Sequence, residues 1–532
     1  MEYFNTKRFL FLVPSNKCVE ELEKVDQFIS LLNKSQIGKI IKKEQKVRGR
    51  SGYNPYNLVA TIIYCFSQFK SSVREIERLC ITDIRIIYLM EQEQPTYNVI
   101  CECINRYILP YQFEIFTMIT KIIIDEFNLD ISVQYLDGTK LEANANKYKF
   151  VWKPTTYHKK LDIKIKDLLE KINIEFKSKN LITSYQLNVL INDYVIEKNI
   201  DINTIPNGKG KRLTDEQKNY KTAYEYLIKL LEYEEKERIC GENRNSYYKT
   251  DKDATAMVLK KDYYSKLSHD FHAGYNIQVL VSSGLITMYG VFQDRTDYNT
   301  LIPMCNSYHD HYDEYPQNLC ADSGYGIYKN YQYIKGNNIG NYVKFQSWEG
   351  ESSGKNPQLF YTFDDGVMCL NTCIGENIPF NQQHKQRYKS GRLYKFTGCN
   401  NCYYSYKCKK NIKNKNEDFR LFELIPEYEL LKEEARNNLL SPVGIEIRIN
   451  RSIQVEGTFG QIKNNMSYVR IRRRGKEKVS CEIMLMCLGR NIRKFFTLID
   501  SDEIKSMYWD KPNNLKKEIF PYVKPKPQKR AE

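Results

Sequence analysis

The chain has 532 residues, 42% of them hydrophobic and 27% charged, which is typical of a folded protein of several domains and excludes an intrinsically disordered chain. Lys and Arg number 81 against 65 Asp and Glu, a net charge of +16 that indicates a polyanionic partner; a basic surface without a partner is the alternative. No apolar run approaches the roughly 20 residues of a membrane span, so we expect no membrane partner. Fifteen cysteines, mostly in apolar stretches, indicate reduced thiols in a cytoplasmic protein.

The first 125 residues are predicted to form an all-helical domain. Apolar residues recur at helical spacing from about Val47 to Tyr107, in short segments that resemble a helix-turn-helix bundle. A basic segment that contains Arg48 and Arg50 precedes them and is suited to lie along DNA phosphates. A generic helical domain with a charged flank explains the same pattern, so the residues alone leave both interpretations open.

The next predicted elements are strands, which place the chain in the α/β class. A strand with alternating apolar residues ends in Asp137, a hairpin begins at Tyr275, and a short buried strand ends in Asp322. A further strand covers residues 341–346. We therefore expect a mixed sheet flanked by helices, built first from residues 126–154 and 250–346.

Two insertions and a tail complete the predicted domains. Residues 155–249 contain two charged stretches of helical period, separated by a segment rich in Asn, Gly and Pro, which predicts a helical hairpin. Residues 347–442 are predicted to be a small, irregular, Cys-rich insertion. Residues 443–500 return to the core with a helix and a basic segment, and 501–532 are expected to be a disordered tail.

Three acidic residues stand out by position. Asp137 and Asp322 end strands, and Glu456 lies on a helix with one apolar stripe. Carboxylates that converge from separate elements can hold two divalent cations about 3.5–4 Å apart, an arrangement that cleaves phosphodiesters, and oxygen ligands suit Mg²⁺. The chain has 65 Asp and Glu, however, and most acids in proteins are solvated or cap a helix.

The predicted helix around Glu456 has two further features. Lys463 stands seven residues after Glu456, so both project from one face and Lys463 is suited to contact a phosphate. Gly457 and Gly460 each cost about 1 kcal/mol relative to Ala in a helix. They make sense if a backbone or a nucleic acid approaches this helix closely.

Several blocks of the sequence resemble those of bacterial insertion-sequence transposases of the DDE type. The blocks occur in the family's order over about residues 40–500. Arg48 to Tyr56 and Ser71 to Glu77 resemble an InsH-like N-terminal domain; Tyr135 to Lys153 resembles the first-aspartate block; Thr250 to Thr255 and Gly274 to Gln278 resemble the lead into the second strand; Ala321 to Gly326 resembles the second-aspartate block; and Arg451 to Gly475 resembles the glutamate block with its basic flank.

The resemblance implies an RNase H-like core whose catalytic and metal-binding acids are Asp137, Asp322 and Glu456, with Mg²⁺ or Mn²⁺ as cofactor. It implies binding of terminal inverted repeats in double-stranded DNA, cleavage there and strand transfer into target DNA, by a homodimer on DNA at the nucleoid of the bacterial cytoplasm. Arg451 departs from the family, because some related transposases carry a tighter Tyr-Arg-Glu-Lys pattern. Lys463 is therefore the better candidate for DNA contact than Arg451.

A cysteine cluster and an arginine run are the remaining candidate sites. Cys399, Cys402 and Cys408 have the spacing of zinc ligands, and Cys369 or Cys373 is suited to complete a structural site; free thiols are the alternative. The transposases that the chain resembles often carry such a cluster, with a cysteine near the position of Cys369. The arginine run is expected to bind DNA phosphates, although such runs are often solvated; it comprises Arg470, Arg472, Arg473 and Arg474.

Two other functions remain open at the level of sequence. A catalytically inactive or repurposed transposase would bind DNA without cleaving it, and the presence of all three acid blocks argues mildly against this. A structure-selective nuclease on the same core would cleave DNA without joining ends.

Overall fold

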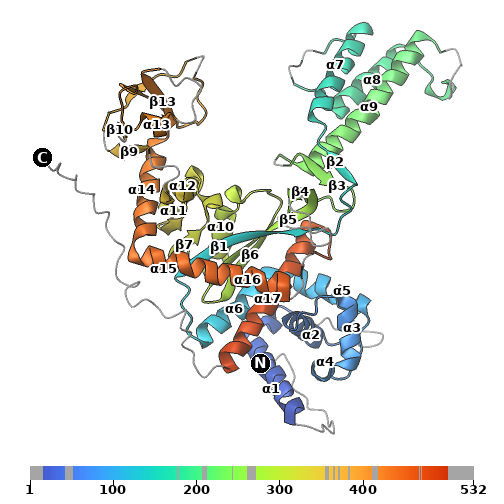
Figure 1. The fold of residues 1–532 in the computed structure, drawn as a ribbon. Helices are drawn as coiled ribbons and strands as arrows, with labels where there is room; N and C mark the ends of the chain where they lie inside the picture. The colour runs from blue at the N-terminus through green and yellow to red at the C-terminus, as the bar shows by residue number, and fades with distance from the viewer. Residues whose placement is uncertain are drawn as a thin grey trace.

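The computed structural model describes residues 16–500, apart from residues 42–51, 177, 179, 206–212, 243, 260–270, 354–358, 364–365, 370–371, 382–383, 410–416, 466–467 and 469. Two predicted parts therefore lie outside the described residues. They are the N-terminal basic stretch with Arg48 and Arg50, and the tail from residue 501. The fold is mixed α/β, with a central mixed sheet, helices on its faces and two projecting parts (Figure 1).

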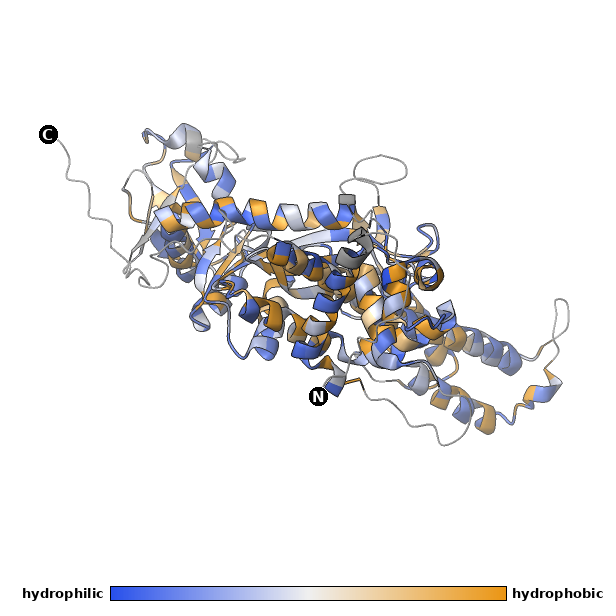
Figure 2. Cartoon of the chain, turned by 90° about the horizontal axis from the view of Figure 1, so that it is seen from below, coloured by the Kyte–Doolittle hydropathy of each residue, from blue (hydrophilic) through white to orange (hydrophobic). Residues whose placement is uncertain are grey.

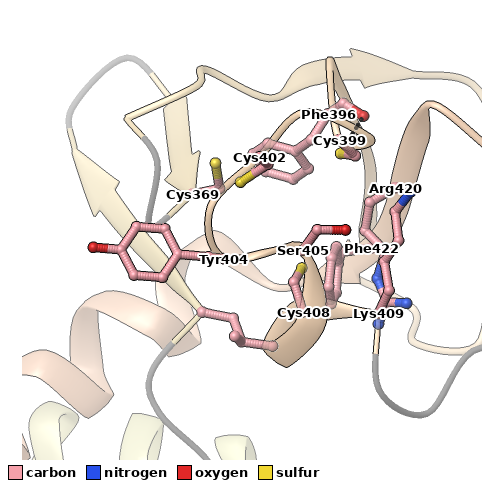
Figure 3. A pocket seen from close by; sticks show the side chains of 11 residues that line it. Cys369, Phe396, Cys399, Cys402, Tyr404, Ser405, Cys408, Lys409, Arg420 and Phe422 are labelled. Carbon is pink, nitrogen blue, oxygen red and sulfur yellow. Dashed lines mark hydrogen bonds between the residues drawn. The ribbon is translucent and has the colours of Figure 1, made fainter.

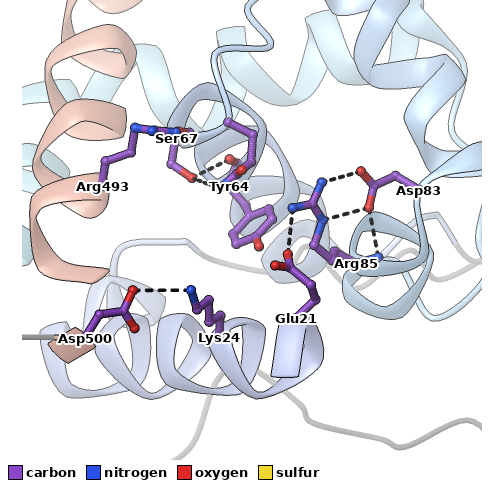
Figure 4. A network of polar contacts seen from close by, with 9 residues as sticks. Glu21, Lys24, Tyr64, Ser67, Asp83, Arg85, Arg493 and Asp500 are labelled. Carbon is purple, nitrogen blue, oxygen red and sulfur yellow. Dashed lines mark hydrogen bonds and ion pairs between the residues drawn. The ribbon is translucent and has the colours of Figure 1, made fainter. Parts of the chain in front are cut away.

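The described part of the N-terminal region is all helical. Its helices pack apolar residues into one continuous core that also includes the long helix α17 (Lys476–Asp500). Charged pairs fasten the same elements together: Lys24 Nζ lies 3.3 Å from Asp500 Oδ2, and Arg85 bridges Glu21 and Asp83 (Figure 4). The helices are α1 (Asn16–Ser35), α2 (Pro55–Ser67), α3 (Val73–Thr82), α4 (Ile84–Leu89), α5 (Tyr97–Cys103) and α6 (Gln112–Glu126).

The central sheet has three parallel strands with an antiparallel hairpin on one side. The predicted strand before Asp137 continues past it, so that β1 spans ten residues. β7 and β8 pair with each other and β7 pairs with β1, all in parallel, whereas β5 runs antiparallel to β1 and carries β6 and β4 on its other edge. The strands are β1 (Val133–Glu142), β4 (Thr255–Val258), β5 (Phe271–Ser282), β6 (Leu285–Phe292), β7 (Asn318–Ala321) and β8 (Gly340–Val343).

Helix α17 packs against β6, the outer strand of the hairpin, and makes hydrogen bonds to backbone groups of β6 and of the turn before it. The Asn491 side chain accepts a hydrogen bond from the Ile286 N–H at 2.9 Å and donates one to the Ile286 carbonyl at 2.7 Å. Arg490, which is buried, donates to the Gly284 carbonyl at 2.6 Å. These bonds occupy groups that an open sheet edge would leave unpaired, so α17 fixes the sheet to the N-terminal helices.

A second apolar cluster lies under the parallel strands. It combines residues of β7 and β8 with α10 (Leu301–Tyr312), α11 (Tyr328–Gly336) and α14 (Pro426–Leu440). Helix α15 (Pro442–Arg451) follows α14 directly and contacts β7 and β8. The chain therefore returns from the Cys-rich region to the sheet along α14 and α15.

The helical insertion differs from the expected two-helix hairpin. It is a bundle of three helices with a core of its own: α7 (Thr155–Lys171), α8 (Ser184–Glu197) and α9 (Asp215–Cys240). The prediction missed α8, although Thr183 and Gln186 form a capping box at its start. The bundle stands on a short two-stranded ribbon of β2 (Phe150–Trp152) and β3 (Ser246–Tyr248). It projects away from the sheet (Figure 1), and Figure 2 shows it at the opposite end of the molecule from the Cys-rich part.

The Cys-rich part is more regular than predicted. The expected irregular insertion, residues 347–442, contains the whole of α14 besides short strands, because Pro426 at the helix start and a run of good helix formers favour a helix there. We name the part before α14 the cysteine module. It contains α12 (Trp348–Ser352), β9 (Phe360–Phe363), β10 (Gly366–Cys369), β11 (Glu376–Ile378), β12 (Arg392–Thr397), α13 (Ser405–Cys408) and β13 (Phe419–Leu424).

One helical stretch, Tyr97–Glu126, is long and apolar enough to pass a test for a membrane span by length and composition alone. Half of its most apolar window is buried inside the fold. Ile115, Phe116 and Ile119 in this stretch belong to the main core, so core packing accounts for its apolar character.

Gly489 predicts a measurable loss of stability on substitution. It lies in the middle of α17, and a Cβ there would stand 2.7 Å from the backbone carbon and oxygen of Phe66. Gly489→Ala should therefore lower the free energy of unfolding by about 1–3 kcal/mol through overpacking, against the usual helix-propensity gain. Gly336→Ala in α11, where no atom lies within 4 Å of the added Cβ, is the matched control. Equal thermal unfolding temperatures for both variants would contradict the close contact.

Candidate active site

Three charged side chains stand in a row across the parallel strands. Leu136 pairs with Ala321 across β1 and β7, and Ala321 pairs with Val343 across β7 and β8. The residues that come next are Asp137 within β1, Asp322 just after β7 and Lys344 just after β8. They therefore stand side by side across the sheet. We name these three residues the charged row.

Direct contacts connect the members of the charged row. Lys344 Nζ lies 3.4 Å from Asp322 Oδ1, and Arg451 Nη1 lies 3.3 Å from Asp137 Oδ2. Arg451 is the last residue of α15 and its side chain is only 10% exposed, so it reaches the carboxylates from a buried position. Arg451, which the sequence made a weaker candidate for DNA binding, instead pairs with Asp137.

The two carboxyl groups have opposite shifts in pKa. Burial raises the pKa of Asp137, with contributions from the negative charges of Asp322 and Asp297, and these outweigh the lowering by Arg451 and by the Gly138 N–H. Burial also acts to raise the pKa of Asp322, but Arg451 and Lys344 outweigh it and the net pKa is lowered. Neighbouring carboxyls with divergent proton affinity are typical of sites that bind cations or transfer protons.

Asp297 belongs to this site although the sequence did not single it out. It lies in the turn before α10, and its Oδ1 accepts hydrogen bonds of 2.8 Å from the side-chain amides of Asn276 and Gln278 on β5. Gly138 leaves room for Gln278, since a Cβ there would lie 2.0 Å from Gln278 Nε2. The Tyr325 hydroxyl donates to Gln278 Oε1 and completes a buried network beside Asp137.

Glu456 lies on the helical stretch that passes over β1. The stretch continues from α15 through a π-helical turn (Ser452–Glu456), α16 (Gly457–Gly460) and a second π-helical turn. Arg451 contacts Asp137 near one end of it and Lys463 donates a hydrogen bond to Thr139 Oγ1 near the other, both on β1. Since π-helical hydrogen bonds span five residues, Glu456 stands about one turn beyond Arg451. Its side chain is exposed, between the two contacts with β1.

The two glycines of this stretch have open space beside them. No atom lies within 4 Å of a Cβ built on Gly457 or Gly460. No backbone of the described residues is therefore what approaches these two glycines.

The acidic residues offer the oxygen ligands that hard cations prefer, although their side chains are not close enough together to hold a metal ion. Asp322 Oδ1 is buried and makes no hydrogen bond of good geometry. Within the described part of the chain, no three His, Cys, Asp or Glu side chains are close enough to hold a metal ion as they stand. Two adjacent carboxylates and an exposed Glu456 on the stretch that crosses β1 are hard oxygen donors, which fit Mg²⁺ or Mn²⁺ better than a softer metal.

The basic segment (Arg470–Arg474) is fastened to β1 and α17 by its backbone. Glu482, buried on α17, accepts hydrogen bonds from the N–H groups of Arg472 (3.2 Å) and Arg473 (2.9 Å) and from the Tyr468 hydroxyl (2.7 Å). Arg470 lies along β1, where its Nε is 3.5 Å from Glu142 Oε1, so it is partly engaged within the protein.

A basic groove of about 550 Å³ lies between this segment and the N-terminal helices. Arg472 and Arg474 are exposed, and Arg474 Nε donates to the Asn144 carbonyl at 2.9 Å. The N-terminal helices and the arginine run, for both of which the sequence predicts DNA contact, thus line one groove. Its charged lining comprises Arg472, Arg473, Arg474, Lys478 and Glu482.

The cysteine module brings its four predicted ligands around one cavity. Cys369, Cys399, Cys402 and Cys408 line a cavity of about 30 Å³ (Figure 3). Cys373 does not line it; its carbonyl accepts a hydrogen bond from the Cys369 N–H at 2.9 Å. Burial and the neighbouring thiols raise the pKa of Cys399 and Cys408 above the ordinary value. Like the acids, the four thiols do not stand close enough together to hold a metal ion as they are. The donor type and number are those of a structural zinc site.

The fold and the site together define a mixed α/β protein with adjacent carboxylates on its parallel strands and a basic groove that begins just past the end of β1. Residues 373–496 match the family described as "Transposase DDE domain". This match includes Glu456, Lys463 and the basic segment, and it supports a DDE-type transposase, as the sequence led us to expect. No curated protein and no solved structure matches the chain.

Proposed function

We propose that the protein is the DNA transposase of an insertion sequence, which binds terminal inverted repeats, cleaves DNA there and joins the 3′ ends to target DNA. The catalytic part is then an RNase H-like core, formed by the sheet of β1, β5, β6, β7 and β8. An InsH-like N-terminal domain would contribute to end recognition. Two ends have to be joined, so a homodimer on DNA in the cytoplasm is the expected working form.

One observation carries this proposal. Asp137 and Asp322 follow paired residues of adjacent parallel strands, and the helical stretch with Glu456 touches the same strand at two points. Three segments that are distant in the sequence thus bring acidic residues to one strand, and a basic groove begins at Asn144, just after the same strand. Acids together with a basic groove suit the cleavage of a polyanion rather than its binding alone.

The protein's own residues have separable tasks in this proposal. Asp137, Asp322 and Glu456 would hold the cations. Before the cations bind, Arg451 balances the negative charge of Asp137 and Asp322. Bound there, Mg²⁺ or Mn²⁺ supplies Lewis-acid stabilisation of the phosphate charge and an activated water. Lys463 and the basic segment hold the DNA backbone, and in-line positioning of the attacking oxygen supplies much of the rate.

A strand-transfer assay tests the proposal. The full chain with Mg²⁺ should nick a duplex that carries the element's terminal repeat and join a pre-cut 3′ end to a plasmid. Cleavage without joining would favour a structure-selective nuclease, and binding without either reaction would favour a repurposed DNA-binding protein.

The cysteine module makes a separate prediction about zinc. We propose Cys369, Cys399, Cys402 and Cys408 as ligands, so the purified protein should contain one zinc ion per chain. Cys402→Ser should lose most of the zinc and make the module more sensitive to protease, because bound metal contributes directly to the stability of small domains. Cys373→Ser, outside the cavity, is the control and should keep its zinc. A zinc-free wild-type protein, with Cys402→Ser as stable as wild type, would dismiss the site.

A further inference from the structure

The ribbon between the sheet and the helical bundle exposes an unusual row of aromatic rings. Tyr148 is 81% exposed, Trp152 is 60% exposed and Phe150 is 45% exposed. Large rings at this exposure cost free energy in water unless a partner covers them. We name the segment from Lys147 to Lys153, together with β3, the aromatic ribbon.

The aromatic ribbon is a rigid surface. Phe150 and Trp152 form a T-shaped pair with ring centroids 5.5 Å apart, and Phe150 also packs against Tyr248 of β3. The turn before β2 is ordered by Asn146, whose side chain accepts a hydrogen bond of 2.9 Å from the Tyr148 N–H. The backbone of the ribbon and the Phe150–Trp152 pair are therefore ordered before any partner arrives, which reduces the entropy lost when one binds.

The charge around the rings indicates what kind of partner covers them. Residues 143–161 contain five lysines and no Asp or Glu. Lys149 and Lys249 are both exposed and lie opposite each other, since the Lys249 N–H donates to the Lys149 carbonyl at 2.9 Å. Lys147 Nζ lies 5.5 Å from the centroid of the Tyr148 ring. Aromatic rings interleaved with cations suit a nucleic-acid strand, which offers base faces and phosphates, better than an apolar protein surface.

The aromatic ribbon is also continuous with the basic segment. Asn144, just before the ribbon, donates to the Arg472 carbonyl at 2.6 Å, and its own carbonyl accepts from Arg474. Figure 1 shows β2 and β3 at the neck between the sheet and the three-helix bundle. DNA that follows the basic segment would therefore reach the rings directly.

We propose that the aromatic ribbon binds unpaired bases of the DNA by stacking, while the basic segment holds the adjoining backbone. Bases inside a duplex have both faces covered by neighbours, so only frayed, flipped or single-stranded bases can stack on these rings. This inference rests on the proposed function, since it assumes that DNA is the substrate.

Binding of the full chain to DNA without divalent cations tests the inference. The probes are a labelled single strand of about 16 nucleotides, within the site sizes of stacking proteins, and the duplex of the same sequence. Tyr148→Ala and Trp152→Ala should each weaken binding of the single strand by about tenfold, as expected when one base no longer has a ring to stack on, and duplex binding by less than about twofold. Trp152→Phe should bind like wild type because it keeps a ring.

Tyr185→Ala is the matched control, since Tyr185 is 77% exposed on α8 of the bundle and lies outside the ribbon. It should bind both probes like wild type. If wild type binds both DNAs and all variants bind alike, or lose affinity for both probes equally, base stacking is wrong while the proposed function survives. If wild type binds neither DNA, both proposals fail. A change of oligomeric state in Trp152→Ala without a change in DNA binding would make the ribbon a contact between copies of the chain and overturn the inference.

Discussion

Asp137→Asn, Asp322→Asn and Glu456→Gln should each reduce DNA cleavage and strand transfer by about 10³-fold or more. The amide keeps the size of each side chain but removes the charge that a hard cation requires. Asp137 and Asp322 stand side by side on adjacent strands, and the third member of the row is Lys344, so the row holds no further carboxylate that could replace a missing one. Binding of the terminal repeat should stay within about twofold of wild type, because the DNA-contacting residues are elsewhere.

Cleavage by the three variants is measured on a labelled terminal-repeat duplex with Mg²⁺ and again with Mn²⁺, with end binding followed by mobility shift. Asp310→Asn, an exposed acid on α10, controls for a general effect of removing negative charge. Wild-type cleavage by any one of the three variants would remove that residue from the site. Loss of end binding along with cleavage would instead indicate misfolding.

Glu482→Gln should destabilise the protein by about 3 kcal/mol and also weaken its binding to DNA. Glu482 is 2% exposed and its carboxylate accepts two backbone N–H bonds from the basic segment and one bond from Tyr468. Hydrogen bonds to a charged group are worth about 1.5–3 kcal/mol each, and the Gln amide nitrogen cannot accept any of them. Without these bonds, Arg472, Arg473 and Arg474 lose their fixed position beside the groove.

Two measurements separate these effects. Chemical denaturation reports stability, and the slope of log affinity against log salt falls by about 0.9 for each phosphate that the protein no longer neutralises. Replacing all three arginines by Ala should reduce the slope without a comparable loss of stability, whereas Glu482→Gln should reduce both. Glu477→Gln, at an exposed position in the first turn of α17, should change neither. Normal stability and an unchanged slope in Glu482→Gln would show that Glu482 does not position the segment.

Local pattern predicted the strands β1, β5, β6, β7 and β8, but not all of their ends, since β1 continues past Asp137 to Glu142. Alternating apolar residues marked β1, and short buried runs followed by a carboxylate marked β7, because strand burial leaves a period-two signal in the sequence itself. Local pattern failed for α8 and α14. Few residues of α8 face the small core of the bundle, and α14 is interrupted by charged residues at nearly every turn, so neither carries a strong apolar stripe.

The candidate site was predictable only in part. The three acids and the cysteine spacing are visible in the sequence as residue types in particular contexts. Asp297 and Lys344 were not, because a polar residue in a turn or after a strand is common and becomes notable only beside Asp137 or Asp322. Arg451 was expected to contact DNA, and only the fold reveals that it pairs with Asp137.

By itself, the sequence determined which residues can carry chemistry here: carboxylates after buried strands, three cysteines with metal-like spacing and a run of arginines. The tertiary structure decided which of them meet. The register of β1, β7 and β8 aligns Asp137, Asp322 and Lys344, and the packing of the cysteine module selects Cys369 over Cys373 to line the cavity. The physical reason is that pairing between distant strands and packing of separate modules depend on the whole core, which no local stretch of sequence encodes.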